Sequence, residues 1–262
     1  MQVITSKDND VVKSIKKLKE KKFRDEKNQY VVEGIKLVAE AIEEDTDIDS
    51  VVVCEDCVND GTIDKKLLYE IAKYKCIYVT EKIFDTLSDV SNPQGIMAVV
   101  NRNADNKEID YSQDFIVALD GIQDPGNLGT ILRTVDSAGL NQIILSKETA
   151  DSFNPKVVRS TMGGIFRVNA VKSENLAETL KDLQNHGFEI VVTSLDTDNS
   201  IYDIEYNKKV IVIGNEANGV SNEIQDMADR KVKIPMLSKT ESLNASVAAG
   251  IMIYEYVREK IQ

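Results

Sequence analysis

The pattern of apolar positions changes near residue 105, and the first part of the chain predicts a small mixed domain. Short apolar segments there predict strands at 29–33, 49–54, 76–80 and 95–101. Amphipathic segments between them predict helices at 8–26, 35–43, 63–74 and 81–88. Strands that alternate with helices are typical of an α/β sandwich, which is the architecture expected for residues 1–103.

After residue 105 the predicted strands are almost continuous apolar runs: FIVAL, QIIL, EIVVTSL and VIVIG. Strands that are apolar on both faces favour a parallel sheet covered by helices on each side. Helices are predicted near 128–139, 154–161, 174–186, 221–228 and 245–260. The polar stretch 101–114 separates the two parts, so we expect a linker at 104–113 and a second α/β domain at 114–262.

Composition narrows the class of protein. No apolar run approaches the roughly 18 residues of a membrane-spanning helix, and MQVITSKDND does not have the pattern of a secretory signal, so we expect a cytoplasmic protein. The net charge of −12 argues against nucleic acid, but residues 11–24 contain seven Lys or Arg and one Glu. This basic segment is either a solvated helix face or a nucleic-acid contact. The RNA-contact candidates in it are Lys13, Lys16, Lys17, Lys21, Lys22 and Arg24.

Cysteine and histidine usage argues against metal and triad chemistry. Cys54 and Cys57 have C-x-x-C spacing, yet the only further zinc ligands of these types are Cys76 and His186. Reduced structural thiols are the alternative interpretation to a zinc or redox site. His186 is the only histidine and precedes a glycine at a predicted helix end, where a cation complements the helix dipole. We therefore expect no metal and no histidine-based hydrolysis.

Three segments of the second domain have residue types suited to ligand binding. In the first, 120–139, a Pro125–Gly126 turn precedes Asn127, which we predict as the helix N-cap. Arg133 lies off the apolar stripe of that helix, and an arginine near a helix N-terminus suits a phosphate. An ordinary capped helix is the alternative, but it does not explain Arg133.

The second segment, 210–221, follows a buried strand with Gly214, Asn215, Glu216 and Gly219, at the strand end where α/β sheets bind ligands. A carboxylate there needs a partner, and we expect Arg133 to be the partner of Glu216. The alternative is a plain strand-to-helix connection. In the third segment, 232–250, Ser242 or Asn244 can cap a helix rich in small residues, a helix that suits packing against another subunit.

The order and spacing of these segments resemble the three motifs of the SpoU/TrmH family of RNA ribose methyltransferases in the SPOUT superfamily. The first segment is similar to its N-x(5)-R motif at Asn127 and Arg133. The second and third segments are similar to its I-G-x-E-x-x-G and I-P-M…S-L-N motifs at 213–219, 234–236 and 242–248. The stretches 30–42 and 91–100 resemble the family's N-terminal substrate-binding domain, which is similar in fold to RNA-binding ribosomal proteins.

This resemblance implies a catalytic domain with a trefoil knot, a homodimer that buries the C-terminal helix, and S-adenosylmethionine as cofactor. It implies catalytic roles for Asn127, Arg133, Glu216, Ser242 and Asn244. It implies cofactor contacts from Thr193, Ser194, Leu195, Gly214, Asn215, Ile234, Met236, Leu243 and Asn244. Since the pKa of arginine exceeds about 12, we expect Arg133 to bind the substrate phosphate and orient the hydroxyl rather than act as the base.

The resemblance also implies that residues 154–170 shape the RNA site, with Arg159 and Arg167 as candidate contacts or as plain surface charge. The expected reaction is 2′-O-ribose methylation, favoured in large-subunit ribosomal RNA because the N-terminal domain suits a structured hairpin. Methylation of transfer RNA is the alternative substrate, and an inactive RNA-binding or assembly protein is the alternative class. The family includes both housekeeping and antibiotic-resistance enzymes, and the chain does not indicate which it is.

Overall fold

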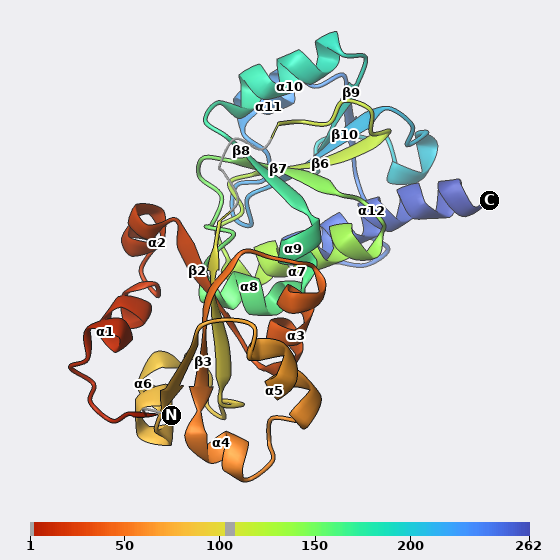
Figure 1. Ribbon diagram of the computed structural model, residues 1–262. Coiled ribbons are helices and arrows are strands. Elements are labelled where there is room, and N and C mark those ends of the chain that lie inside the picture. Colours follow the sequence, from red (N-terminus) through yellow and green to blue (C-terminus); the bar gives the residue numbers. More distant parts are fainter. Residues whose placement is uncertain (1–2, 103–107) are drawn as a thin grey trace. The chain divides into compact units, whose positions relative to one another are not determined.

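The computed structural model describes residues 3–102 and 108–262, and the chain forms two compact units (Figure 1). Unit 1 consists of Met1–Asp105 together with Phe153–Phe166, and unit 2 consists of Asn106–Ser152 and Arg167–Gln262. Within the described residues, no helix is both long enough and apolar enough to span a bilayer.

Unit 1 is built on a five-stranded sheet of order β1-β4-β3-β5-β2. Its strands are β1 (Val3–Ile4), β2 (Gln29–Glu33), β3 (Ile48–Cys54), β4 (Cys76–Val79) and β5 (Ile96–Asn101). β5 pairs antiparallel with β2 and β3, whereas β4 pairs parallel with β3 and β1. The four predicted strands are therefore present, and the short strand β1 is additional.

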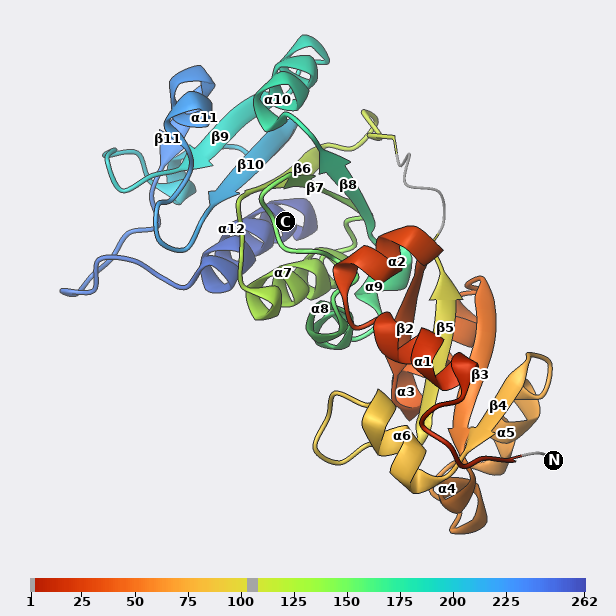
Figure 2. The same cartoon turned by 90° about the vertical axis from the view of Figure 1, so that its left-hand side faces the viewer.

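Helices cover both faces of this sheet, because successive residues of its central strands point to opposite sides. Val52 packs into an apolar cluster with α1 (Asp10–Lys17) and α6 (Glu81–Leu87). Val53 packs into a second cluster with α3 (Ile35–Glu43) and α5 (Lys65–Ile71). Two further helices, α2 (Lys21–Lys27) and α4 (Glu55–Asn59), lie at the ends of this layered structure (Figure 2).

The segment Phe153–Phe166 joins unit 1 although it follows unit 2 residues in the chain. It contains α8 (Pro155–Thr161), which contacts β2, and leads into α9 (Gly164–Arg167). Val158 is buried in the same cluster as Val53, and the Phe153 ring lies 4.7 Å from that of Tyr30. The second apolar cluster of unit 1 is thus completed by residues from beyond position 150.

The predicted single helix 8–26 is wrong, since the chain turns between α1 and α2. The break is held by Arg24, whose Nη1 donates to the carbonyl oxygens of Leu18 at 2.8 Å and Lys19 at 2.7 Å. Arg24 is only 2% exposed. Its guanidinium therefore satisfies backbone carbonyls that the interrupted helix leaves without partners.

Unit 2 contains a six-stranded sheet of order β11-β9-β10-β6-β7-β8 in which every pairing is parallel. The strands are β6 (Phe115–Asp120), β7 (Gln142–Ser146), β8 (Asn169–Ser173), β9 (Glu189–Thr193), β10 (Lys209–Gly214) and β11 (Arg230–Val232). The parallel sheet predicted from the apolar runs is confirmed. The apolar pattern does not indicate β8, because its sequence NAVKS has only two apolar residues.

Helices again cover two faces of the sheet in unit 2 (Figure 1). On one face α10 (Leu176–Asn185) and α11 (Asn222–Met227) pack over the strands through residues such as Leu180 and Ile224. On the other face α7 (Pro125–Ser137) and α12 (Ala245–Ile261) lie side by side. A short 3₁₀ helix, η1 (Ile201–Asp203), precedes β10.

Part of the predicted linker 104–113 lies outside the described residues, which omit 103–107. The remainder belongs to unit 2, because Ile109 and Tyr111 pack against the cluster under α10. The Tyr111 hydroxyl donates to Asp182, and its ring stacks on His186 with centroids 3.9 Å apart.

Candidate active site

The site is built at the carboxyl ends of two neighbouring strands of unit 2. β6 ends at Asp120 and β10 ends at Gly214, and these two residues are register partners in the sheet. The loops that follow lead to α7 on one side and to Glu216 on the other. Because parallel strands open their carboxyl ends at one edge, the two loops meet where α/β sheets bind ligands.

Asp124, and not Asn127, is the N-cap of α7. The Asp124 carboxylate accepts from the Asn127 backbone N–H at 2.9 Å, and Pro125 occupies the first helical position. The prediction of Asn127 as the cap is therefore wrong. As the third residue of the helix, Asn127 has a side chain that is not used for capping and faces the neighbouring loops.

A chain of side-chain hydrogen bonds connects the three predicted motifs. Asn127 Nδ2 donates to Glu216 Oε1 at 2.8 Å, and Asn244 Nδ2 donates to Asn127 Oδ1 at 3.0 Å. Asn244 Oδ1 in turn accepts from the Ser246 backbone N–H at 2.9 Å and caps α12. A carboxylate only accepts hydrogen bonds, so Glu216 fixes which way the Asn127 amide points, and Asn127 then does the same for Asn244.

Glu216 is held in its charged form by these contacts. Partial burial raises the pKa of its carboxyl, but hydrogen bonds from Asn127 and from backbone N–H groups outweigh burial and lower the pKa overall. The backbone donors from the neighbouring loop are Gln123 and Asp124, each at 3.3 Å. The expectation that Arg133 would be the partner of Glu216 is wrong, since amide and backbone N–H groups fill that role.

Asn215 ties the loop after β10 to the loop after β6. Its Nδ2 donates to the Gly121 carbonyl at 2.7 Å, and its Oδ1 accepts from the Ala217 backbone N–H at 2.9 Å. Gly214 lies so close to the returning chain that a Cβ would be 2.1 Å from the Gly219 carbonyl carbon. This tight turn is what brings Glu216 back toward Asn127.

A cavity of about 550 Å³ opens beside this turn, within the size range of small-molecule sites. It is lined by eight of the nine predicted cofactor residues: Thr193, Ser194, Leu195, Gly214, Asn215, Ile234, Met236 and Leu243. Asn244, the ninth, is not in the lining and instead caps α12. Glu216 and Ser242, predicted as catalytic, border the same cavity.

Several lining residues were missed in the sequence, among them Asp196, Lys233 and Glu241. Asp196 and Glu241 directly flank predicted residues, so extending each motif by one position finds them. Their carboxylates add hydrogen-bond acceptors to the lining, while Ile234, Met236 and Leu243 provide apolar surface. A wall of this kind suits an adenosine-like ligand, with a flat ring against apolar side chains and polar groups near acceptors.

Arg133 lies on the exposed side of α7. In the part of the chain that the structure describes, its guanidinium has no ion pair or hydrogen bond, although its backbone carbonyl accepts from the Ser137 hydroxyl at 2.7 Å. The side chain is therefore available to an anionic ligand.

The candidate RNA contacts differ in their surroundings. Lys13, Lys16, Lys17, Lys21 and Lys22 are exposed on α1 and α2. Arg24 is buried and supports the turn between these helices. The prediction of Arg24 as an RNA contact is therefore wrong, and its role is structural. Arg167 forms a two-point ion pair with Asp136, at 2.9 and 2.8 Å.

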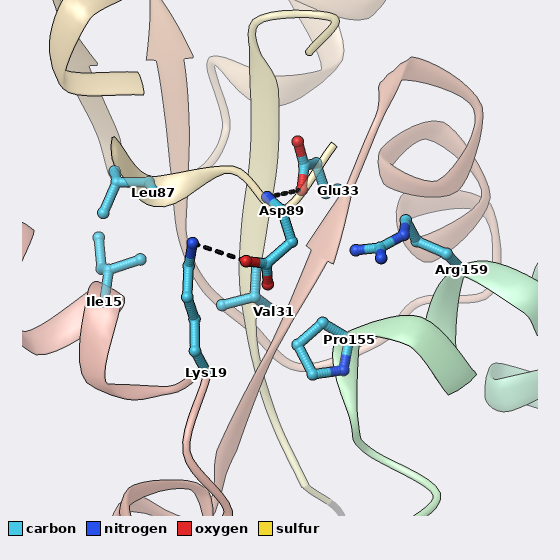
Figure 3. Close-up of a pocket in the computed structure, with 8 residues that line it drawn as sticks. All are labelled: Ile15, Lys19, Val31, Glu33, Leu87, Asp89, Pro155 and Arg159. Atoms are coloured by element: carbon cyan, nitrogen blue, oxygen red, sulfur yellow. Dashed lines mark hydrogen bonds and ion pairs between the residues drawn. The ribbon is translucent and has the colours of Figure 1, made fainter. Parts of the chain in front are cut away.

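Arg159 of α8 lies at a small pocket of unit 1 whose volume of about 10 Å³ has room for one water molecule. Figure 3 shows its guanidinium pointing toward the acidic residues Glu33 and Asp89. Its Nη1 is buried and has no hydrogen-bond partner among the described residues. The Arg159 side chain is half-buried, which argues against the interpretation of Arg159 as plain surface charge.

The three cysteines are free thiols. Burial and the neighbouring Cys54 raise the pKa of Cys57 to about 12, which disfavours the thiolate needed for metal or redox chemistry. The interpretation of Cys54 and Cys57 as reduced structural thiols is therefore favoured. Gly95 packs directly on them, since a Cβ there would lie 2.3 Å from Cys57 Sγ.

The fold and the site together define a two-unit α/β protein with a cavity of about 550 Å³ at the carboxyl edge of a parallel sheet. Comparison with known proteins identifies the family. Residues 114–254 match the SpoU rRNA Methylase family, and residues 9–98 match the MRM3-like substrate binding domain. The chain belongs to the SpoU rRNA methylase family.

Relatives match over nearly the whole chain. The 23S rRNA (guanosine(2553)-2′-O)-methyltransferase RlmP of Bacillus subtilis is 31% identical over 97% of this chain and 98% of its own. The AdoMet-bound rRNA methyltransferase from Sinorhizobium meliloti is 31% identical, with a TM-score of 0.84 and coverage of 98% of this chain and 97% of that one.

The SpoU methyltransferase AviRb from Streptomyces viridochromogenes, in complex with AdoMet, is 26% identical, with a TM-score of 0.85. The match covers 97% of this chain and 99% of AviRb. The predicted family, the α/β fold class with a parallel C-terminal sheet, the enzyme class and the cofactor are confirmed. The chain is an S-adenosylmethionine-dependent RNA 2′-O-methyltransferase.

Proposed function

We propose that this enzyme methylates a ribose 2′-hydroxyl in large-subunit ribosomal RNA. The observation that carries the proposal is the hydrogen-bond chain Glu216–Asn127–Asn244 beside the 550 Å³ cavity. The similarity to a relative named for 23S rRNA, over almost the full length of both chains, favours ribosomal RNA over transfer RNA. Ribosomal RNA as substrate would place the enzyme in the cytoplasm.

We assign the cofactor to the cavity, where bound S-adenosylmethionine supplies an electrophilic methyl group on its sulfonium. Ile234, Met236 and Leu243 provide the apolar wall for the adenine ring. Gly214 and Asn215 line the cavity at the end of β10, and Thr193, Ser194 and Leu195 line the wall after β9. As in the family, we expect the segment that ends at Asn244 to form a trefoil knot.

We assign Arg133 to the phosphate next to the target ribose. It is exposed and without a charged partner in the described residues, and a guanidinium grips a phosphate through two parallel hydrogen bonds. Holding the phosphate orients the adjacent 2′-hydroxyl toward the methyl group, and orientation of reacting groups supplies much of the rate enhancement in such reactions.

We assign Glu216 to positioning and not to proton abstraction, because both of its carboxylate oxygens already accept hydrogen bonds. Through Asn127 it holds Asn244 in place at the start of α12. Ser242 lines the cavity two residues before Asn244, where its hydroxyl is available to the reacting groups.

We infer a homodimer that uses α12. Val247, Tyr254 and Ile261 are apolar, exposed and spaced seven residues apart, so they lie along one side of the helix. An exposed apolar stripe on a helix is typical of an interface. Sedimentation of the wild type and of a Val247→Asp, Tyr254→Asp variant tests this, since a dimer that uses the stripe should dissociate in the variant.

Mapping of 2′-O-methylated nucleotides in the source organism tests the substrate. RNA from a strain without this gene should lose one or a few modified positions in large-subunit RNA, and the gene should restore them. Loss in transfer RNA alone would favour the second substrate. No loss in any RNA, together with no binding of S-adenosylmethionine by the purified protein, would favour an inactive RNA-binding protein.

A further inference from the structure

Phe23, on the first turn of α2, is set apart from the core of unit 1. It is half-buried and belongs to neither of the two apolar clusters that flank the sheet. Two lysine ammonium groups approach its ring instead, with Lys17 Nζ at 5.0 Å and Lys22 Nζ at 5.9 Å from the ring centroid. Phe23 therefore combines a partly exposed ring with two neighbouring cations.

The two lysines have no acidic partner among the described residues. Among the residues that the structure describes, Lys17 and Lys22 form no ion pair, whereas nearby Lys13 pairs with Asp8 at 3.4 Å and Lys19 with Asp89 at 2.8 Å. The π face of Phe23 attracts both ammonium groups weakly in the free protein. A phosphate group is a stronger partner and would draw them away from the ring.

The corner that presents Phe23 is held in place by buried and part-buried contacts. Arg24 donates to the carbonyl oxygens of Leu18 and Lys19, and so fixes the turn between α1 and α2. Lys19 Nζ donates to the Ser88 carbonyl at 2.8 Å and pairs with Asp89, a contact that is visible in Figure 3. Lys17 before the turn and Phe23 after it therefore remain close together without a ligand, and a preformed surface loses less entropy on binding.

We propose that Phe23 is a stacking surface for an unpaired base of the RNA substrate, with Lys17 and Lys22 contacting the flanking phosphates. This inference rests on the proposed function, because it names the part of the RNA that unit 1 recognises. Unpaired bases stack on aromatic side chains, whereas the bases of a continuous duplex have no free face. The surface therefore selects a loop, bulge or strand end over a paired stem.

The absence of tryptophan from the chain allows a direct test. The Phe23→Trp variant of the full-length protein carries one indole, whose fluorescence is quenched by a stacked base. Titration of this variant with an oligoadenylate of about 12 nucleotides, within the site sizes of single-strand binders, should quench its fluorescence. The matched control is Tyr69→Trp on α5, at a position that is 72% exposed and has Lys73 Nζ at 5.9 Å from the native ring. Lys73 is paired with Glu70, so the fluorescence of the control variant should not be quenched.

Affinity measurements provide the second test. Phe23→Leu keeps an apolar side chain but removes the π face, so it should weaken oligoadenylate binding about tenfold. Binding of a blunt RNA duplex of equal length should change less than about twofold, because its contacts are with the phosphate backbone. The Lys17→Gln, Lys22→Gln variant should weaken binding of both RNAs.

The outcomes separate this inference from the proposed function. Equal oligoadenylate affinity of the wild type and Phe23→Leu, or binding to Phe23→Trp without quenching of its indole, would overturn the stacking surface while methyl transfer by the wild type continues. Failure of the wild type to bind oligoadenylate would overturn it as well. The proposed function fails only if the wild type also transfers no methyl group to RNA.

Discussion

Asn127 and Glu216 are 89 residues apart in the chain, yet Asn127 Nδ2 donates to Glu216 Oε1 at 2.8 Å. The contact joins the first turn of α7 to the loop after β10, and it brings two family motifs into one site. Since Asn244 donates to the same Asn127, the third motif is joined as well. The geometry of the site therefore depends on these side-chain amides and on the carboxylate that orients them.

Glu216 should make the stability of the protein sensitive to acid. Its folded-state pKa is lowered below the ordinary value of 4.5, so its contribution is present above that value and is lost as the pH falls through the folded-state pKa. The Glu216→Gln variant should be less stable than the wild type at pH 7, and the difference should shrink below about pH 4.5. Thermal denaturation at both pH values measures this, with Glu223→Gln of α11 as an exposed control. A difference that stays constant with pH would contradict the assignment.

Arg133→Lys should keep cofactor binding and slow methyl transfer. A lysine retains the positive charge but cannot form two parallel hydrogen bonds to a phosphate. We therefore expect kcat/KM for RNA to fall about 10- to 100-fold, which corresponds to the loss of one or two charged hydrogen bonds. Steady-state kinetics and calorimetry with S-adenosylmethionine measure the two effects. Arg230→Lys, on β11 and paired with Glu189, is the matched control. Near-normal turnover of Arg133→Lys would show that two-point binding is not needed.

Gly214→Ala should disrupt both the turn and the cofactor site. The new methyl group would lie 2.1 Å from backbone atoms of Gly219 and Val220, which cannot move aside as a side chain can. Overpacking of this kind costs about 1–3 kcal/mol. We expect a lower Tm and no measurable cofactor binding. Gly250→Ala is the control, because its methyl group would meet only Thr134 Cγ2, at 4.0 Å. Equal Tm and cofactor binding in the two variants would contradict the role of Gly214.

Reversing the charge of Lys16, Lys17, Lys21 and Lys22 to Glu should weaken RNA binding and leave cofactor binding intact. These lysines lie in unit 1, whereas the cofactor cavity is formed by unit 2 residues. Each phosphate contact that is lost should also reduce the salt dependence of RNA affinity by about one unit of slope. Filter binding at several salt concentrations, with calorimetry for the cofactor, measures both. Parallel loss of the two affinities would argue against separate roles for the two units.

Much of the fold could be predicted because the spacing of apolar residues indicates which faces of the helices and strands are buried. The continuous apolar runs of β6 and β10 indicate a parallel sheet, and the alternation in unit 1 indicates a layered α/β domain. The break between α1 and α2 could not be predicted, since residues 8–26 keep helical spacing throughout and the turn depends on buried Arg24. The pattern of α8 shows an apolar face but not which core will bury it, so its membership in unit 1 was also not evident.

The sequence motifs predicted which residues line the candidate site. They predicted less well which hydrogen bonds those residues form, because that depends on the backbone geometry. Eight of the nine proposed cofactor residues line the cavity. Asn127 and Asp124 are both plausible caps for α7, and only the backbone geometry selects Asp124. The choice of Arg133 as the partner of Glu216 relied on charge alone, whereas the nearby amide and N–H donors satisfy the carboxylate.

The most direct test of the central claim is transfer of a labelled methyl group from S-adenosylmethionine to RNA purified from a strain that lacks the gene. The RNA is separated by size, and the labelled nucleotide is tested for resistance to alkaline cleavage, which requires a free 2′-hydroxyl. We predict alkali-resistant label in large-subunit RNA, formed about 10- to 100-fold more slowly by the Arg133→Lys variant. Label that alkali releases as ordinary nucleotides, or label confined to a base, would contradict 2′-O-methylation by this site.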